Sequence, residues 1–175
     1  MPGTTGSAKP SAGASKTGGN GGGNGDGAIA PCTAAGVSVS ATNEDEKGAT
    51  VKHLLLTLTN ISGKKCTVHH YPSVLVGTDA QAPVPVIKDS DPKALATLAP
   101  GEKAHAALLV RGGHRDEYPA YSLVVTLQGP KLGDREPESI KVALPGVDVV
   151  WADDGARVTY WTTASGYALD FIMSS

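Results

Sequence analysis

Two cysteines and five histidines are the residues of this 175-residue sequence best suited to metal, redox or acid–base chemistry. Zinc sites use closely spaced cysteine and histidine pairs, and blue-copper sites use a compact group of His, Cys and Met ligands. The sequence has no Cys-x-x-Cys motif, and its internal methionine, Met173, has no neighbouring histidine. A copper or zinc site built from histidines stays open as an alternative, with these candidate ligands: His53, His69, His70 and His105.

The adjacent pair His69 and His70 restricts such a metal site. Successive side chains of a β-strand point to opposite faces, so only one of the pair could join His53 or His105. The fifth histidine, His114, follows two glycines and is expected in a loop. Exposed strand and loop positions are therefore the simpler interpretation of all five histidines.

Cys32 and Cys66 are predicted to form a disulfide. Alternating patterns near residues 35–43 and 50–59 predict an antiparallel hairpin, and a turn at 61–65 returns the chain to the sheet end where the hairpin starts. Both sulfur atoms then lie at one edge, and closing a loop of about 35 residues would stabilise the fold by roughly 4 kcal/mol. A reactive Cys66 would need a partner base or further thiolates. A disulfide indicates export to an oxidising compartment.

Catalytic motifs are missing from the sequence. It contains no Gly-x-Ser-x-Gly elbow, no His-Glu-x-x-His and no Walker loop, and its glycine repeats are not followed by a helix pattern. Acidic residues cluster at 44–46 and at Asp153-Asp154, where turns are predicted and the carboxylates are expected to be solvated. We therefore expect no enzyme, no catalytic residue and no cofactor.

Short alternating runs predict the architecture. Leu54, Leu56 and Leu58 form one face of a strand, and similar runs recur along the chain to residues 157–163 and 168–173, separated by Gly/Pro turns such as 99–102. A 3.6-residue apolar period is not sustained, so helix is expected at most near 91–95 or 115–118. The pattern predicts an all-β, immunoglobulin-like antiparallel β-sandwich.

Composition divides the chain in two. Residues 1–27 hold ten of the 22 glycines and little apolar surface, which predicts a disordered Gly/Ser-rich linker, and residues 28–175 are predicted to form a single domain. Because Lys and Arg number 15 and Asp and Glu 17, nucleic acid is not expected as a partner. No apolar run reaches the roughly 18 residues of a membrane span. The linker starts without a signal sequence, and we expect the native export signal to lie outside this sequence.

Most of the aromatic residues fall in the last third of the chain, where they are expected to supply much of one core layer. Some of them could instead form an exposed binding surface, because Tyr and Trp combine large contact area with a polar group. The candidates for this surface are Tyr118, Tyr121, Trp151, Trp161 and Tyr167.

Two stretches in the middle of the sequence, LTLTNISGKKCTVHHYPSV and TLAPGEK, follow a first cysteine at Cys32 and carry a recognisable pattern. Its residues are Asn60, Ser62, Gly63, Cys66, Thr67, Tyr71, Pro72, Leu98, Pro100 and Gly101. In this pattern the sequence resembles a family of exported actinobacterial proteins and lipoproteins, domain of unknown function 4232, over roughly residues 31–130. His70 stands where the family more often has glycine. The resemblance implies a secreted or lipid-anchored β-sandwich and supplies no catalytic residues.

These observations predict a non-enzymatic extracytoplasmic module that binds an envelope component, such as a glycan, or another exported protein. Contact with a membrane is expected only through a lipid anchor outside this sequence. The histidine-based metal protein is the alternative from a different functional class.

Overall fold

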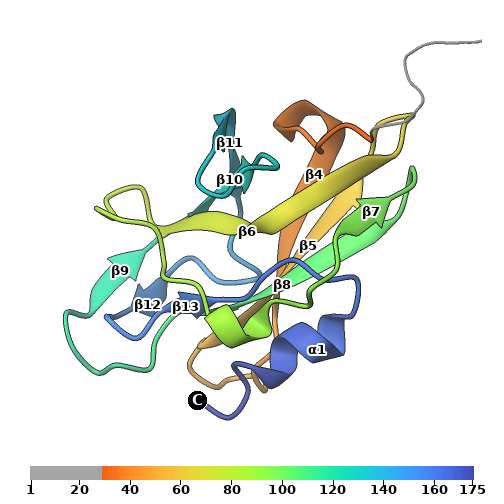
Figure 1. The fold of residues 1–175 in the computed structure, drawn as a ribbon. Coiled ribbons are helices and arrows are strands. Elements are labelled where there is room, and N and C mark those ends of the chain that lie inside the picture. Colours follow the sequence, from red (N-terminus) through yellow and green to blue (C-terminus); the bar gives the residue numbers. More distant parts are fainter. Residues whose placement is uncertain (1–28) are drawn as a thin grey trace, which may run out of the picture. The chain divides into compact units, whose positions relative to one another are not determined.

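Alternating apolar and polar residues build two four-stranded antiparallel sheets in the structure, a computed structural model that describes residues 29–175 (Figure 1). The predicted linker at 1–27 lies outside the described residues. One sheet has the order β11-β10-β6-β7 and the other the order β13-β8-β5-β4. The first sheet consists of β6 (Cys66–Val76), β7 (Ala96–Leu98), β10 (Leu123–Gln128) and β11 (Arg135–Val142). The second consists of β4 (Val37–Asn43), β5 (His53–Asn60), β8 (Lys103–Leu109) and β13 (Arg157–Val158).

The core lies between the two sheets. Leu54, Leu56 and Leu58 of β5 are fully buried on its inner face, and Val74 and Val125 face them from the other sheet within the same apolar cluster. Each fully buried leucine or valine contributes about 2 kcal/mol relative to an exposed one. The prediction of an all-β antiparallel sandwich is confirmed.

The predicted hairpin is also confirmed. β4 and β5 pair antiparallel in an unbroken register from Val37 opposite Asn60 to Asn43 opposite Leu54. This register puts the chain preceding β4 beside the turn that follows β5, and the bridge between Pro31 and Thr67 joins the start of β6 to the same place.

A two-stranded ribbon extends from one end of the sandwich. It consists of β9 (Tyr118–Ala120) and β12 (Val150–Ala152), which pair antiparallel. Figure 1 shows it at the left, beyond the end of β6. Tyr118 ties the ribbon to the first sheet, because its hydroxyl donates to the Val76 oxygen at 2.9 Å.

The strand predicted at 168–173 is wrong. Ser165–Asp170 form the helix α1, and its Ala168, together with Ile172 in the turn that follows, packs on Ala107 and Leu109 of β8. Buried residues four apart fit one helix face, but this single turn of pattern is too short to stand out in the sequence. Helix, which the sequence allowed at most near 91–95 or 115–118, does not form at either place. Within residues 29–175 the chain forms the 3₁₀ turns η2 (Ala34–Gly36) and η3 (Lys88–Ser90).

The expectation that C-terminal aromatic residues build a core layer is also wrong. Of these residues only Trp161 is buried in the core, whereas Tyr121 and Trp151 are exposed. Leucine, valine and alanine fill the space between the sheets, because small aliphatic side chains on both inner faces already pack it.

Candidate functional site

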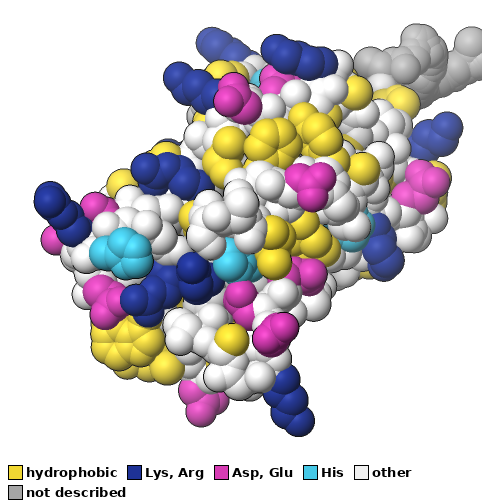
Figure 2. All heavy atoms as spheres, turned by 90° about the horizontal axis from the view of Figure 1, so that it is seen from below, with side chains coloured by type: hydrophobic (Ala, Val, Ile, Leu, Met, Phe, Trp, Pro, Cys, Tyr) yellow, Lys and Arg dark blue, Asp and Glu magenta, His cyan; other side chains and the backbone are white. Residues whose placement is uncertain are grey.

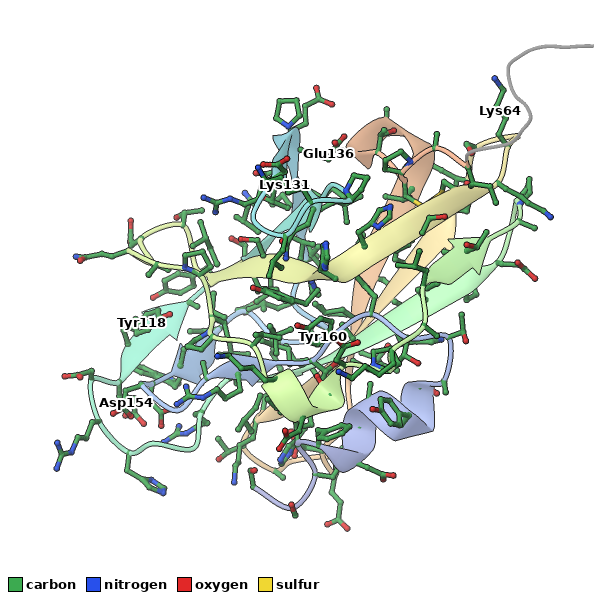
Figure 3. The ribbon with its side chains drawn as sticks, in the orientation of Figure 1. Lys64, Tyr118, Lys131, Glu136, Asp154 and Tyr160 are labelled. Atoms are coloured by element: carbon green, nitrogen blue, oxygen red, sulfur yellow. A yellow bond between two sulfur atoms is a disulfide. The ribbon has the colours of Figure 1, made fainter. Side chains whose placement is uncertain are left out.

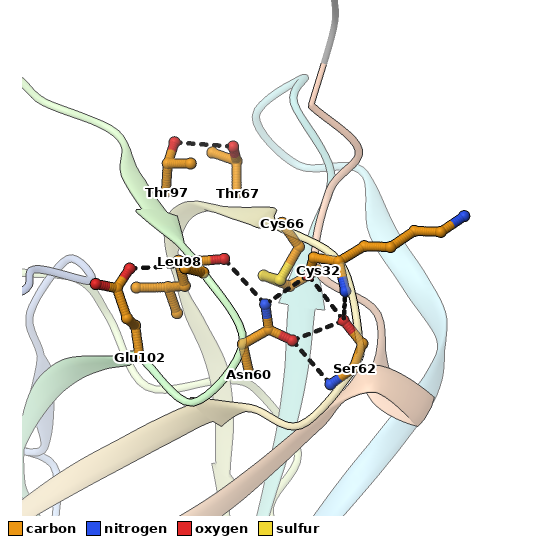
Figure 4. The surroundings of a disulfide bond; sticks show 10 residues. Cys32, Asn60, Ser62, Cys66, Thr67, Thr97, Leu98 and Glu102 are labelled. Carbon is orange, nitrogen blue, oxygen red and sulfur yellow. Dashed lines mark hydrogen bonds between the residues drawn. A yellow bond between two sulfur atoms is a disulfide. The ribbon is translucent and has the colours of Figure 1, made fainter. Parts of the chain in front are cut away.

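The two cysteines form the predicted disulfide at one corner of the sandwich (Figure 4). Cys32 and Cys66 have Cα atoms 4.8 Å apart, and both side chains are buried. Because buried sulfur atoms are shielded from attacking thiolates, this disulfide is structural. It indicates an oxidising, extracytoplasmic environment.

Asn60 organises the same corner. Its side chain is fully buried, and its Nδ2 donates to the carbonyl oxygens of Lys64 at 2.8 Å and Leu98 at 2.9 Å. Its Oδ1 accepts bonds from the backbone N–H and the hydroxyl of Ser62 (Figure 4). Asn60, Ser62 and Leu98, three of the residues that carried the family resemblance, therefore hold the turn before Cys66 and do not form a binding surface.

His53 pairs with Asp45 and is buried, 6% exposed, not exposed as expected from the sequence. Nδ1 of His53 lies 2.6 Å from the Asp45 carboxylate, which also accepts the backbone N–H groups of Lys52 and His53. Burial acts to raise the pKa of Asp45, but the hydrogen bonds from His53 and Lys52 outweigh it and lower that pKa below its ordinary value. Nε2 of His53 lies 3.2 Å from the Ser175 oxygen, so this oriented imidazole contacts an acceptor and not a nucleophilic hydroxyl.

The other histidines are scattered. Nδ1 of His105 lies 3.1 Å from the Thr57 hydroxyl on the outer face of the second sheet. His69 and His70 lie on β6 with ring centroids 6.0 Å apart. Burial, and then the neighbouring His70, lower the pKa of His69. Within residues 29–175, no group of three or more His, Cys, Asp or Glu side chains is placed to hold a metal ion.

The ribbon exposes two of the five aromatic candidates. Trp151 is 45% exposed and lies opposite Pro119 in the β9–β12 register. Tyr121 is 69% exposed and lies in the bend directly after β9, two residues beyond Pro119. We call Pro119, Tyr121 and Trp151 the aromatic ribbon surface.

The remaining aromatic candidates lie elsewhere. Trp161 is only 2% exposed and cannot belong to a free surface. Tyr118 is itself part of β9 but is half-buried, and burial raises its pKa. Tyr167 is exposed on α1, where its ring packs against Phe171 at 5.2 Å. Of the five candidates, the structure therefore leaves Tyr121 and Trp151 exposed on or directly beside the ribbon.

A buried carboxylate that sequence reasoning missed fixes the ribbon. Asp153 follows β12 directly and is 4% exposed, not solvated as expected for a turn. Burial acts to raise its pKa, but hydrogen bonds from backbone N–H groups lower it to about 2. The loop after β8 is thereby tied to the turn after β12. The donors are the N–H groups of Gly112, Gly113, His114 and Gly155, at 2.8 to 3.2 Å.

Close backbone packing explains the glycines around Asp153. A Cβ atom on Gly113 would lie 1.8 Å from Asp154 Oδ1 and 2.6 Å from the Gly155 nitrogen, and one on Gly155 would lie 2.2 Å from the Gly113 nitrogen. Only residues without a side chain allow the two segments to meet this closely. The Arg-Gly-Gly sequence was the signal that could have pointed to this approach.

A second candidate site surrounds a bulge in β6. The pairing of β6 with β10 jumps from Ser73 opposite Thr126 to His69 opposite Gln128, so β6 carries two additional residues there. His70 adopts a φ of 60°, in the left-handed region that favours glycine. Bulges of this kind turn side chains away from the regular alternation and are common beside functional sites.

Two hollows flank this bulge. One has a volume of about 260 Å³ and is lined by His70, Tyr160 and Trp161 together with the segment 91–95. The other, of about 340 Å³, is lined by Tyr71, Arg135 and the segment 83–86 among others. The rings of Tyr71 and Tyr160 stand between them, edge to face, with centroids 5.1 Å apart. Figure 3 shows Tyr160 near the middle of the molecule and Tyr118 at its left, so the hollows are well separated from the ribbon.

The surface charge is mixed. On the face drawn in Figure 2, lysine and arginine side chains are interspersed with aspartate, glutamate and hydrophobic patches. This mixture of charges on the drawn face agrees with the net charge of -2. None of the helices in the described part of the chain is long and apolar enough to cross a membrane.

Comparison with known proteins places these features in a family. No curated protein and no solved structure shows significant similarity to the chain. One family model, described as a domain of unknown function (DUF4232), matches residues 32–162. The match extends beyond residue 130, where the resemblance seen in the sequence ended. It thus includes the segment with β13 and Trp161, which completes the second sheet and the core. It starts at Cys32 and includes the disulfide, the Asn60 corner, the ribbon and both hollows, and the chain therefore belongs to the DUF4232 family.

Proposed function

We propose that this protein is a non-enzymatic binding module of the cell envelope, secreted or held by a lipid anchor, and that it contacts an exported protein through the aromatic ribbon surface. The extracytoplasmic address is supported by the disulfide. Exposure of Trp151 and Tyr121 beside Pro119 is the observation that carries the proposed contact.

The chemistry of the aromatic ribbon surface supports a protein partner. Trp and Tyr dominate the energetics of protein interfaces, since each brings a large contact area and loses little side-chain entropy on binding. The Asp153 hydrogen bonds hold the end of the ribbon where β9 begins and β12 ends, so the backbone that carries the aromatic side chains is preorganised from that end. A rigid ribbon with two exposed aromatics suits a compact contact whose centre is Trp151.

Interaction capture with a matched control tests this proposal. The protein and its Trp151→Ala/Tyr121→Ala variant are immobilised, exposed to proteins from the envelope fraction of the source cells, and compared by quantitative mass spectrometry. We expect at least one exported protein whose capture falls about tenfold or more with the variant, the usual loss when a central aromatic is truncated.

Tyr167→Ala serves as the control, because Tyr167 is an exposed aromatic on α1, away from the ribbon. Equal capture of every protein by the wild type and the double variant would rule out the aromatic ribbon surface as the contact.

A further inference from the structure

We propose that the two hollows beside the β6 bulge form one saccharide-binding site, with the Tyr71–Tyr160 pair as the ridge between two sugar positions. This site is separate from the aromatic ribbon surface, and the inference does not depend on the proposed protein contact. The glycan is a chain of at least two units, because the ridge divides the site into two hollows of about 260 and 340 Å³.

Because of the bulge, two neighbouring residues of β6 line two different hollows. In a regular strand His70 and Tyr71 would point to opposite faces of the sheet. The left-handed conformation of His70 breaks that alternation, and the two side chains line adjacent hollows. His70 Nε2 lies 2.9 Å from the Pro130 oxygen, which fixes its ring. A non-glycine residue at such a φ is retained at a cost in stability, which is a feature of ligand sites.

Polar groups with unused hydrogen-bonding capacity line the hollows. The hydroxyls of Tyr71 and Tyr160 make no hydrogen bond to any described residue, and burial, then Asp91 and Tyr71, raise the pKa of Tyr160 above its ordinary value. One oxygen of Asp91 accepts the Lys93 N–H, which leaves the second oxygen for a ligand. Arg135 adds a guanidinium whose only polar contact in the described residues is a long one, 3.4 Å to the Ser73 hydroxyl.

Trp161 supplies an independent observation. Trp161 lines the first hollow and is only 2% exposed. Its Nε1–H has no acceptor in the described part of the chain. A buried donor without an acceptor costs about 1–3 kcal/mol. Because the Nε1 atom itself has less than 1 Å² of exposed surface, a ligand hydroxyl would pair with this donor only after the side chains around it shift on binding.

These groups match a sugar better than a peptide. A sugar ring offers hydroxyls that both donate and accept, together with C–H faces that pack on rings and on apolar side chains such as Val68 and Pro92. An extended peptide would need free backbone groups for strand addition. β6 has few to offer at this point: the His70 oxygen accepts the Trp161 N–H and the Val74 oxygen accepts the Val84 N–H.

Glycan-array binding followed by tryptophan fluorescence tests the inference. The intact protein is applied to an array of bacterial envelope oligosaccharides and, in parallel, to an array of extended peptides. The soluble form of any oligosaccharide hit is then titrated into the Trp151→Phe variant, in which Trp161 is the remaining tryptophan of the two in the sequence. We expect binding of an oligosaccharide, with a change in Trp161 emission.

Two ridge variants, one in the ridge and one in the adjoining first hollow, and one ribbon variant give the discriminating comparison. Tyr160→Phe removes a hydroxyl, and Asp91→Asn removes the negative charge and replaces one acceptor oxygen with a donor, while both keep the shape of the side chain. Each, placed in the Trp151→Phe background, should weaken oligosaccharide binding roughly fivefold or more. Tyr121→Ala in the same background should leave it unchanged. Circular dichroism confirms that the variants are folded.

The inference is overturned if no oligosaccharide on the array binds, if only peptides bind, or if both ridge variants bind the oligosaccharide as well as their parent. If Tyr121→Ala were the one variant that lost oligosaccharide binding, the sugar would bind at the ribbon, and the inference would also be overturned. None of these outcomes depends on whether the aromatic ribbon surface captures an exported protein.

Discussion

Asp153 holds the backbone of the β9–β12 ribbon, although its own side chain is buried and is not part of the aromatic ribbon surface. Its carboxylate accepts hydrogen bonds from backbone N–H groups of two loops that lie some forty residues apart along the chain. Asp154, its neighbour, is exposed. Two adjacent aspartates in a predicted turn look equivalent in the sequence, and only the position of the 112–114 loop distinguishes them.

Replacing Asp153 with alanine should lower the free energy of unfolding by about 3 kcal/mol, because buried backbone N–H groups lose their acceptor. Urea denaturation monitored by circular dichroism measures this loss. Asp154→Ala is the matched control and should change the stability by about 0.5 kcal/mol or less. A similar loss for both variants would mean that the hydrogen bonds to Asp153 contribute nothing specific.

The same carboxylate predicts an acid-sensitive stability. The pKa of Asp153 in the folded protein is about 2, below the ordinary value of 3.8, so the folded state binds this proton less readily than the unfolded state. Its stabilisation, about 2 kcal/mol, is complete above about pH 4 and is lost as the pH falls toward about 2. Asp45, whose pKa is also lowered, acts in the same direction. Asp153→Asn should flatten the dependence in urea titrations at stepwise pH, and an unchanged slope between pH 4 and 2 would contradict the assignment.

At the scale of elements, the two irregular pieces matter most for function. The β6 bulge turns His70 and Tyr71 toward the hollows, and the β9–β12 ribbon presents Trp151. The role of α1 is structural, since Ala168 of the helix and Ile172 in the turn after it cover the outer face of β8. Each of these three elements departs from the regular alternation that forms the rest of the sandwich.

Shortening Ile172 should detach α1. The side chain is fully buried against the β8 surface, so Ile172→Ala should cost about 3 kcal/mol through lost burial and the cavity left behind. Met173→Ala, at the exposed neighbouring position, is the control and should cost about 0.5 kcal/mol or less. Hydrogen exchange should show faster amide exchange across 168–173 in the first variant only. Unchanged protection there would mean that α1 does not depend on this contact.

At the scale of the whole molecule, the disulfide closes the corner where the first strand, the Asn60 turn and β6 meet. It joins residues separated by 34 positions, and so restricts the unfolded chain over the whole β4–β5 hairpin. Such a restraint persists in an oxidising environment outside the cytoplasm, where thiols are not kept reduced.

Removing the disulfide should therefore lower the stability by about 4 kcal/mol. The Cys32→Ser/Cys66→Ser variant is compared with the oxidised wild type in urea. Thr33→Ser, an exposed substitution beside Cys32, is the control and should leave the midpoint nearly unchanged. A loss below about 1 kcal/mol in the double variant would show that the hydrogen bonds of Asn60 hold the corner by themselves.

Much of the fold could be predicted because its signals are local. Leu54, Leu56 and Leu58 recur at every second position because one face of β5 is buried, and this period survives in the sequence although Leu55 also is apolar. Cys32 and Cys66 could be paired because hairpin geometry limits where each can lie. The helix α1 was missed because its buried face is a single turn long.

The sequence by itself thus determined the strand class, the hairpin and the disulfide, since each depends on neighbours along the chain or on a short closed loop. Only the tertiary structure decided that Trp161 is buried while Trp151 is exposed, that Asp153 binds a distant loop, and that His70 and Tyr71 line adjacent hollows. Those outcomes depend on which segments pack together across the two sheets. Contacts between residues far apart in the chain leave no periodic pattern in a single sequence.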